Sequence, residues 1–174
     1  LHEGCRVAGY DRTPTRLTAE LEQEGAEIHY DESVEAIPAE MRDPATTVVV
    51  YTPAVPTNHA EYRYFVEQGF RIEKRSQMLG YLSEGKRVMA VAGTHGKTTT
   101  STLVAWLNRV VTGGGSAFLG GISKNFSGNL VLGEGNRLAV EADEFDRSFL
   151  RLTPDVAVIT SVAPDHLDTY GTFE

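Results

Sequence analysis

The segment from Val88 to Thr100 constrains the fold of this chain more than any other. A short apolar run, Val88–Ala92, ends in a glycine-flanked turn, and a Lys-Thr pair then opens a helix. In such a strand–loop–helix unit, glycines let backbone N–H groups close on phosphate oxygens, and the helix N-terminus adds partial positive charge. The segment therefore predicts a phosphate-binding loop within an α/β sheet.

The loop residues that we expect to bind nucleotide are Gly93, Thr94, His95, Gly96, Lys97, Thr98 and Thr99. Lys97 would reach the outer phosphates, and the Thr98 hydroxyl would ligate Mg²⁺. The loop is shorter than its common form, which has a further glycine where this chain has Val91. His95 lies inside the loop, where it would touch phosphate or substrate. We interpret the loop as an ATP site; the alternative is a glycine-rich turn with a solvated lysine.

Composition excludes several classes of protein. Hydrophobic residues make up 41% of the chain and charged residues 23%, which is ordinary for a soluble globular protein. The formal net charge of −8 argues against broad nucleic-acid binding, because a phosphate backbone needs a basic surface. No apolar stretch approaches the length of a bilayer span, so we expect no membrane association and a cytoplasmic protein. The single cysteine, Cys5, is expected to be a small buried residue.

Strands and helices alternate along the chain, which predicts parallel sheets with helices on their faces. We expect an α/β protein with two Rossmann-like or P-loop parallel-sheet domains, at residues 1–83 and 87–174, the second truncated. Ser83–Lys86 is the expected linker, because a new strand and the phosphate loop follow it. The chain lacks a starting methionine and stops just past a polar motif, so we expect it to be a fragment of a longer protein.

Local patterns set the expected elements. We expect strands at 6–11, 27–30, 47–51, 70–73, 87–92, 130–131, 138–140 and 156–159. Helices are expected at 13–23 with Thr13 as the N-cap, and at 58–68, 76–83 and 97–111. The glycines around Gly120–Gly121 indicate turns. In the last helix an apolar stripe, with Trp106 beside it, is expected to face the core; it consists of Leu103, Leu107, Val110 and Val111.

An acidic cluster follows the strand at 138–140. Ligands of open α/β sheets bind outside the carboxyl ends of the strands, so this placement suggests chemistry. Glu141, the first residue off the strand, is the candidate for a second Mg²⁺ contact. For Asp143, Glu144 and Asp146, which follow it, we favour charges at a helix start or in a solvated turn.

A second cluster, Asp165–Asp168, comes after the last expected strand. His166 has carboxylates on both sides and suits Mg²⁺ or Mn²⁺, and spacing alone leaves a structural histidine equally open. His2, His29 and His59 have no such company in the sequence and receive no role. No serine or cysteine has the context of a nucleophile. The chain instead fits phosphoryl transfer, where positioning and charge neutralisation supply most of the catalysis.

On these motifs the chain resembles the Mur ligase family. The matching segments are Gly93–Thr100, Glu141–Glu144 and Asp165–Tyr170, with weaker matches at Thr52–Val55 and Lys74–Leu79. The resemblance implies a UDP-sugar-binding domain, a central ATPase and a C-terminal domain. The chain would hold most of the first domain, without its first strand and glycine-rich loop, and the front of the second.

The resemblance also implies a reaction. A substrate carboxylate attacks the γ-phosphate of ATP, and an amine then displaces phosphate from the resulting acyl phosphate. Lys97 would hold the β- and γ-phosphates, Thr98 and Glu141 one Mg²⁺, and His166 a second ion, with Mn²⁺ able to substitute. Lys97 and His166 would thus be the catalytic residues. Many members have asparagine where this chain has Ser161, which leaves open any contact made by that amide.

Within the family, Asp146–Leu150 is similar to the members that join L-alanine to UDP-N-acetylmuramate in peptidoglycan precursor synthesis. The implied partners are therefore ATP and these two small molecules. One alternative is a recycling ligase that attaches a whole tripeptide and shares the histidine-containing loop. Another is a non-catalytic nucleotide-binding domain, although Lys97, Thr98, Glu141 and His166 are all retained. We expect the chain alone to be inactive as a ligase.

Overall fold

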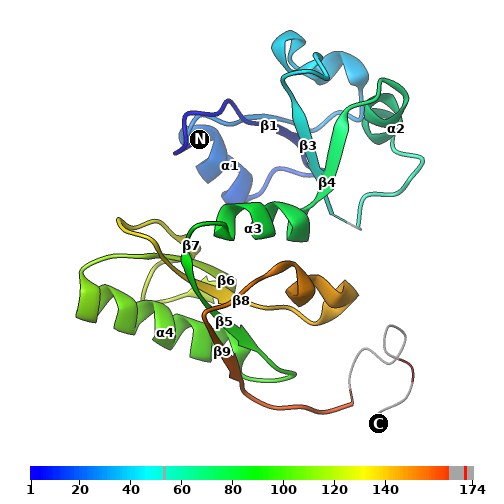
Figure 1. Cartoon of the computed structure of the whole chain (residues 1–174). Helices are drawn as coiled ribbons and strands as arrows, with labels where there is room; N and C mark the ends of the chain where they lie inside the picture. The colour runs from blue at the N-terminus through cyan, green and yellow to red at the C-terminus, as the bar shows by residue number, and fades with distance from the viewer. Residues whose placement is uncertain (53, 165–170, 172–174) are drawn as a thin grey trace. The chain divides into compact units, whose positions relative to one another are not determined.

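The computed structural model describes residues 1–52, 54–164 and 171, and it confirms an α/β fold with parallel strands (Figure 1). The chain forms two compact units, Leu1–Arg75 and Ser76–Glu174. In the described part of the chain, no helix combines the length and the apolar character that a membrane crossing requires.

The described residues of the first unit, 1–52 and 54–75, form four short strands, two α-helices and two 3₁₀ turns. They are β1 (Ala8–Tyr10), α1 (Arg16–Gln23), β2 (Glu27–His29), η1 (Val34–Ala36), η2 (Ala39–Met41), β3 (Val48–Tyr51), α2 (Ala60–Glu67) and β4 (Arg71–Lys74). The strands form two separate parallel pairs, β1 with β2 and β3 with β4.

Helix α1 begins later than the sequence predicted, because Thr15 rather than Thr13 is its N-cap. The Thr15 hydroxyl accepts a hydrogen bond from the Thr18 N–H at 3.1 Å, and the Thr18 hydroxyl accepts one from the Thr15 N–H at 2.8 Å. This reciprocal pair is a capping box, with threonine in place of the usual glutamate or glutamine. The expectation for Cys5 was also wrong, since this residue before β1 is exposed.

Two histidines that received no role lie in the interior of the first unit. Nε2 of His29 lies 2.9 Å from Oε1 of Glu61, and the His59 side chain is 7% exposed. The Tyr10 ring is close to both, with its centroid 5.9 Å from that of His29 and 4.6 Å from that of His59. These neighbours come from distant segments of the chain, so the sequence alone did not reveal them.

The second unit is built on a five-stranded sheet. Its elements are α3 (Arg75–Ser83), β5 (Arg87–Ala92), α4 (Lys97–Thr112), β6 (Ser116–Ser123), β7 (Gly128–Val131), β8 (Arg137–Glu141), η3 (Phe145–Arg151) and β9 (Val156–Ile159). The strand order is β7-β6-β8-β5-β9. All neighbours are parallel except β7, which runs antiparallel to β6.

Strand β6 was missed by the sequence analysis, which expected turns around its two central glycines. Glycine inside a strand often marks close approach by another group. Here a Cβ on Gly120 would overlap the carboxylate of Glu141. The glycine therefore makes room for an acidic side chain from the neighbouring strand β8 and does not end the strand.

Different layers cover the two faces of this sheet (Figure 1). On one face, Leu79 of α3 and Phe149 and Leu152 of the η3 segment pack against a cluster that includes Val88 and Leu138. On the other face lies α4, and a second cluster is made there by Ala105, Ala117, Leu119 and Ala139. The core of this unit therefore consists of two clusters, one under α3 and η3 and the other under α4.

The apolar stripe of α4 that was predicted to face the core is exposed instead. Exposure reaches 57% at Leu103 and 75% at Val111. The buried residues of the helix are Ser101, Ala105 and Asn108. Small residues on this face let the helix come close to the alanines of the sheet, whereas the large side chains would hold it away. Hydrophobicity alone therefore predicted the wrong face of α4 to be buried.

Two leucines of this unit offer a test of that assignment. Leu138 in β8 is 0% exposed and Leu107 in α4 is 58% exposed. We expect Leu138→Ala to lower the free energy of unfolding by about 2–5 kcal/mol, because it leaves a cavity. Leu107→Ala should change it by no more than about 0.5 kcal/mol. Urea unfolding followed by circular dichroism measures both, and equal losses would contradict the exposed face of α4.

Candidate phosphate-binding site

Three parallel strands end at the same edge of the sheet of the second unit. Strand β5 pairs with both β8 and β9, and their last residues are Ala92, Glu141 and Ile159. The segments that follow these strands, 93–96, 142–144 and 160–163, therefore start side by side. This edge is where ligands of open parallel sheets bind.

Lys97, the first residue of α4, directs its ammonium group into its own loop. Nζ donates to the carbonyl oxygen of Gly93 at 2.7 Å, and the carbonyl oxygen of Thr94 lies 3.4 Å away. The same nitrogen lies 2.9 Å from Oε1 and 2.8 Å from Oε2 of Glu144. Both charged side chains are mostly buried, at 15% and 20% exposure. The lysine is thus held at the centre of the loop.

The residues after β9 hold the loop from outside. The Thr94 N–H donates to the carbonyl oxygen of Ser161 at 2.9 Å, and the His95 N–H donates to the Ser161 hydroxyl at 3.0 Å. The Thr160 hydroxyl donates to the His95 carbonyl at 2.6 Å, and the Ala163 N–H donates to the Thr94 hydroxyl at 3.0 Å. Four bonds between neighbouring segments therefore fix the backbone of the loop.

Gly93 is the point where these two segments come closest. Its φ is +126°, a value that L side chains rarely adopt. A Cβ there would overlap the Thr160 hydroxyl and lie 2.8 Å from the carbonyl oxygen of Ser161. The loop can follow this path only because residue 93 has no side chain.

Glu141 is positioned by β6 and α4. Its Oε2 accepts a hydrogen bond from the Gly120 N–H at 2.9 Å, and the Ser101 hydroxyl lies 3.5 Å from the same oxygen. Ser101 also donates to the carbonyl oxygen of Thr98, one turn earlier in α4. A Cβ on Gly121 would lie 3.5 Å from the Thr98 methyl group. Glu141 of β8 and Thr98 of α4 thus lie next to two consecutive residues of β6, Gly120 and Gly121.

The structure brings most of the residues predicted for the site to this edge. Lys97 and Thr98 are half-buried there, whereas His95 and Thr99 are exposed. His166, with the rest of the second acidic cluster, lies outside the described residues. Among the residues that are described, no three histidine, cysteine or acidic side chains gather as a set that could hold a metal ion.

The sequence analysis did not predict a role in the site for three of its residues. Glu144 was expected to be a charge at a helix start or in a solvated turn; it does directly precede the helix η3, but it also pairs with Lys97. Thr160 and Ser161 hold the loop; both follow an apolar strand, and Ser161 was noted only because many family members have asparagine at its position. Their role in the site can be inferred only once β9 is known to pair with β5, and the sequence alone does not reveal this pairing.

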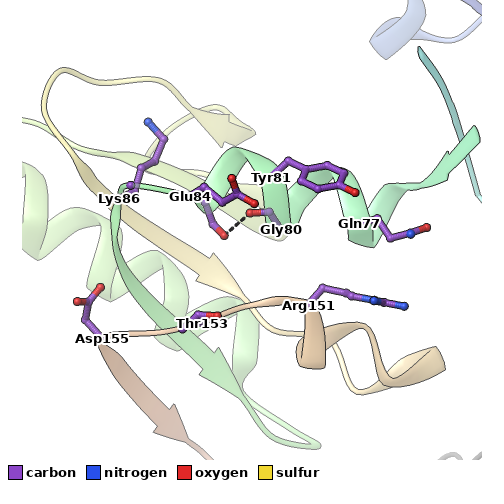
Figure 2. Close-up of a pocket in the computed structure, with 10 residues that line it drawn as sticks. Gln77, Gly80, Tyr81, Glu84, Lys86, Arg151, Thr153 and Asp155 are labelled. Carbon is purple, nitrogen blue, oxygen red and sulfur yellow. Dashed lines mark hydrogen bonds between the residues drawn. The ribbon is translucent and has the colours of Figure 1, made fainter. Parts of the chain in front are cut away.

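A cavity of about 380 Å³ lies elsewhere in this unit (Figure 2). It is lined by α3 from Gln77 onward with the turn after it, and by the segment from Arg151 to Asp155. Lys86 and Asp155 directly precede β5 and β9, and the Asp155 carboxylate accepts a hydrogen bond from the Val88 N–H at 2.7 Å. The cavity is therefore at the opposite ends of the strands and is not part of the phosphate loop.

Replacing Ser161 tests the bond that holds the loop. Ser161→Ala removes the hydroxyl that accepts the His95 N–H, at a cost of about 0.5–1.5 kcal/mol. We expect faster hydrogen exchange at the His95 amide, measured by NMR. The Thr94 amide is an internal control, because its acceptor is the backbone carbonyl of the same residue. Unchanged exchange at His95 would show that this bond does not stabilise the loop.

Comparison with known proteins identifies related sequences along the whole chain. The profile described as "Mur ligase family, catalytic domain" matches residues 1–87, and that of the "Mur ligase middle domain" matches residues 91–174. The UDP-N-acetylmuramate–L-alanine ligase of Phocaeicola vulgatus is 58% identical over 100% of this chain, and that of Parabacteroides distasonis is 53% identical. The chain spans 38% of the length of each of these relatives.

Solved structures show the same fold. The UDP-N-acetylmuramate-alanine ligase of Thermotoga maritima matches 96% of this chain with a TM-score of 0.82 and 30% identity, and the chain covers 38% of it. The UDP-N-acetylmuramate:L-alanyl-γ-D-glutamyl-meso-diaminopimelate ligase of a Neisseria species matches 98% with a TM-score of 0.86. That protein is 23% identical and 57% covered, so it supports the fold alone.

Proposed function

Since this chain belongs to the Mur ligase family, we propose that it is the nucleotide-binding part of an ATP-dependent ligase. The ligase joins L-alanine to the carboxylate of UDP-N-acetylmuramate through an acyl phosphate. Residues 87–174 form the front of the ATPase domain, and residues 1–83 belong to the domain that binds the UDP-sugar. The observation that carries the proposal is the meeting of the Lys97 loop and Glu141 at one sheet edge.

Each residue of the site has a chemical task in this proposal. The ammonium of Lys97 neutralises charge on the β- and γ-phosphates, while N–H groups at the start of α4 donate hydrogen bonds to phosphate oxygens. The oxygens of Thr98 and Glu141 are the donors that Mg²⁺ prefers, and Mn²⁺ takes the same donors. Bound Mg²⁺ supplies further neutralisation of phosphate charge. His166 is proposed to hold a second ion.

The carboxylate of Glu141 suits this metal because its position is fixed beforehand. The Gly120 N–H binds one carboxylate oxygen, and Ser101 lies beside it. Such supporting hydrogen bonds orient metal ligands and strengthen binding. A carboxylate held by a strand and a helix therefore needs little reorganisation when an ion arrives.

The choice of L-alanine as substrate is supported by the curated relatives, which carry that activity in their names at 58% and 53% identity. ATP and a nucleotide sugar are cytoplasmic metabolites, so we propose that the protein works in the cytoplasm. The net charge of −8 fits small-molecule partners better than nucleic acid. Attachment of a tripeptide is the alternative, because a solved murein peptide ligase that is 26% identical has this fold.

The assay that tests the proposal is phosphate release from ATP, in a protein of the relatives' full length that carries these residues. UDP-N-acetylmuramate and Mg²⁺ are present, and L-alanine is compared with preformed tripeptide. Turnover that favours L-alanine is the expected result. Preference for tripeptide would assign the protein to the recycling reaction. No turnover with either amine would leave only a nucleotide-binding role.

Lys97→Ala tests the phosphate loop. We expect ATP turnover in that assay to fall by about 100-fold or more, because a charge that stabilises the transition state is removed. Lys124→Ala is the matched control, since it removes the same charge from an exposed position between β6 and β7. A Lys97→Ala protein as active as the Lys124→Ala protein would refute the role of the loop in catalysis.

Gly120→Ala tests the position of Glu141 without touching its carboxyl group. The new Cβ would displace the carboxylate, and the Mg²⁺ concentration for half-maximal turnover should rise by about tenfold or more. Gly121→Ala is the control, because its Cβ would make an ordinary contact at 3.5 Å with the Thr98 methyl group. Identical Mg²⁺ titrations for both variants would remove Glu141 from the metal site.

A further inference from the structure

Lys97 and Glu144 form an ion pair inside the loop that the proposed function assigns to phosphate. An ammonium group has three N–H donors. In the structure, those of Lys97 face the Gly93 carbonyl at 2.7 Å, the Thr94 carbonyl at 3.4 Å and the Glu144 carboxylate at 2.8–2.9 Å. The Lys97 ammonium group therefore has protein oxygens as its hydrogen-bond acceptors.

A polyphosphate and this carboxylate compete for the same charge. Lys97 and Glu144 are mostly shielded from water, at 15% and 20% exposure, so their attraction is screened less than that of a surface pair. Phosphate oxygens that approach the ammonium also approach the carboxylate, and like charges repel at such distances. Placing both anions next to Lys97 therefore costs electrostatic free energy.

We propose that Glu144 is a positioning residue that holds Lys97 in the nucleotide-free loop and yields it when phosphate binds. The inference rests on the proposed function, because it takes the outer phosphates of ATP as the incoming anion. The exchange keeps the lysine inside the loop before the nucleotide arrives. It also weakens apparent nucleotide affinity, since only the fraction of molecules with a released lysine is competent to bind.

The test compares nucleotide binding by calorimetry between the unsubstituted chain and five variants, with Mg²⁺ and the analogue ATPγS as the probe. We expect Glu144→Gln to lower the Kd for ATPγS by roughly three- to tenfold, because the competing charge is gone and more of the lysine is released. AMP lacks the outer phosphates, so its Kd should not change. Glu134→Gln is the matched control, removing the same charge from an exposed loop before β8.

In this mechanism, the tighter ATPγS binding of Glu144→Gln depends on the presence of Lys97. Lys97→Ala should weaken ATPγS binding, and adding Glu144→Gln to it should give none of the improvement seen in the parent chain. A general effect of net charge would survive in this double variant and would also appear in Glu134→Gln. Glu144→Asp is a second variant that keeps the charge on a shorter side chain, and its gain should be smaller than that of Glu144→Gln.

The outcomes separate the two proposals. If the unsubstituted chain does not bind ATPγS, or if Lys97→Ala binds it equally well, the proposed nucleotide site itself is wrong. If binding depends on Lys97 but Glu144→Gln leaves it unchanged or weakens it, only the role of Glu144 is overturned. Weaker binding would place Glu144 among the groups that support nucleotide or metal.

Discussion

The pairing of β5 with β8 on one side and β9 on the other is the constraint on which the phosphate site depends. Parallel strands end at the same edge, so three segments that are far apart in sequence must leave the sheet side by side. The loop after β5 then lies between two others. One carries Glu141 and Glu144, and the other carries Thr160 and Ser161, which bind the loop backbone. The loop therefore owes its shape to its neighbours as well as to its own glycines.

Close approach of neighbouring segments explains where this unit uses small residues. Gly93 admits the Thr160–Ser161 backbone, and Gly120 admits the carboxylate of Glu141. On the buried face of α4, Ala105 packs with alanines of the sheet, which keeps the helix near the strands. The start of α4 consequently lies close enough for Ser101 to reach Glu141. Packing and site geometry are thus set by the same choice of small side chains.

Local signals in the sequence were sufficient for the elements around the loop. The strand predicted at 87–92 is β5, and the helix predicted at 97–111 is α4 with one further residue. Each is followed directly by a glycine with positive φ, Gly93 after β5 and Gly113 after α4. The family resemblance based on the same motifs is confirmed by the two family profiles. The predictions that were wrong concern features that depend on tertiary contacts. The inward face of α4 depends on the size of residues in β6 and β8. Strand β6 was missed because its two central glycines resemble a turn, although Gly120 is there to make room for Glu141.

The acidic segment after β8 shows most clearly why residue type does not determine role. Glu141 and Glu144 are three residues apart, and both lie at the phosphate loop, yet their surroundings differ. Glu141 faces N–H and hydroxyl donors, which stabilise a carboxylate while leaving it able to accept a cation. Glu144 already faces a cation, the ammonium of Lys97. A carboxylate that faces only neutral donors, such as Glu141, can bind a metal ion. A carboxylate that is paired with a lysine, such as Glu144, must separate from the ammonium before a phosphate can bind to it. In a chain with a net charge of −8, a loop for an anionic ligand thus carries its own exchangeable anion.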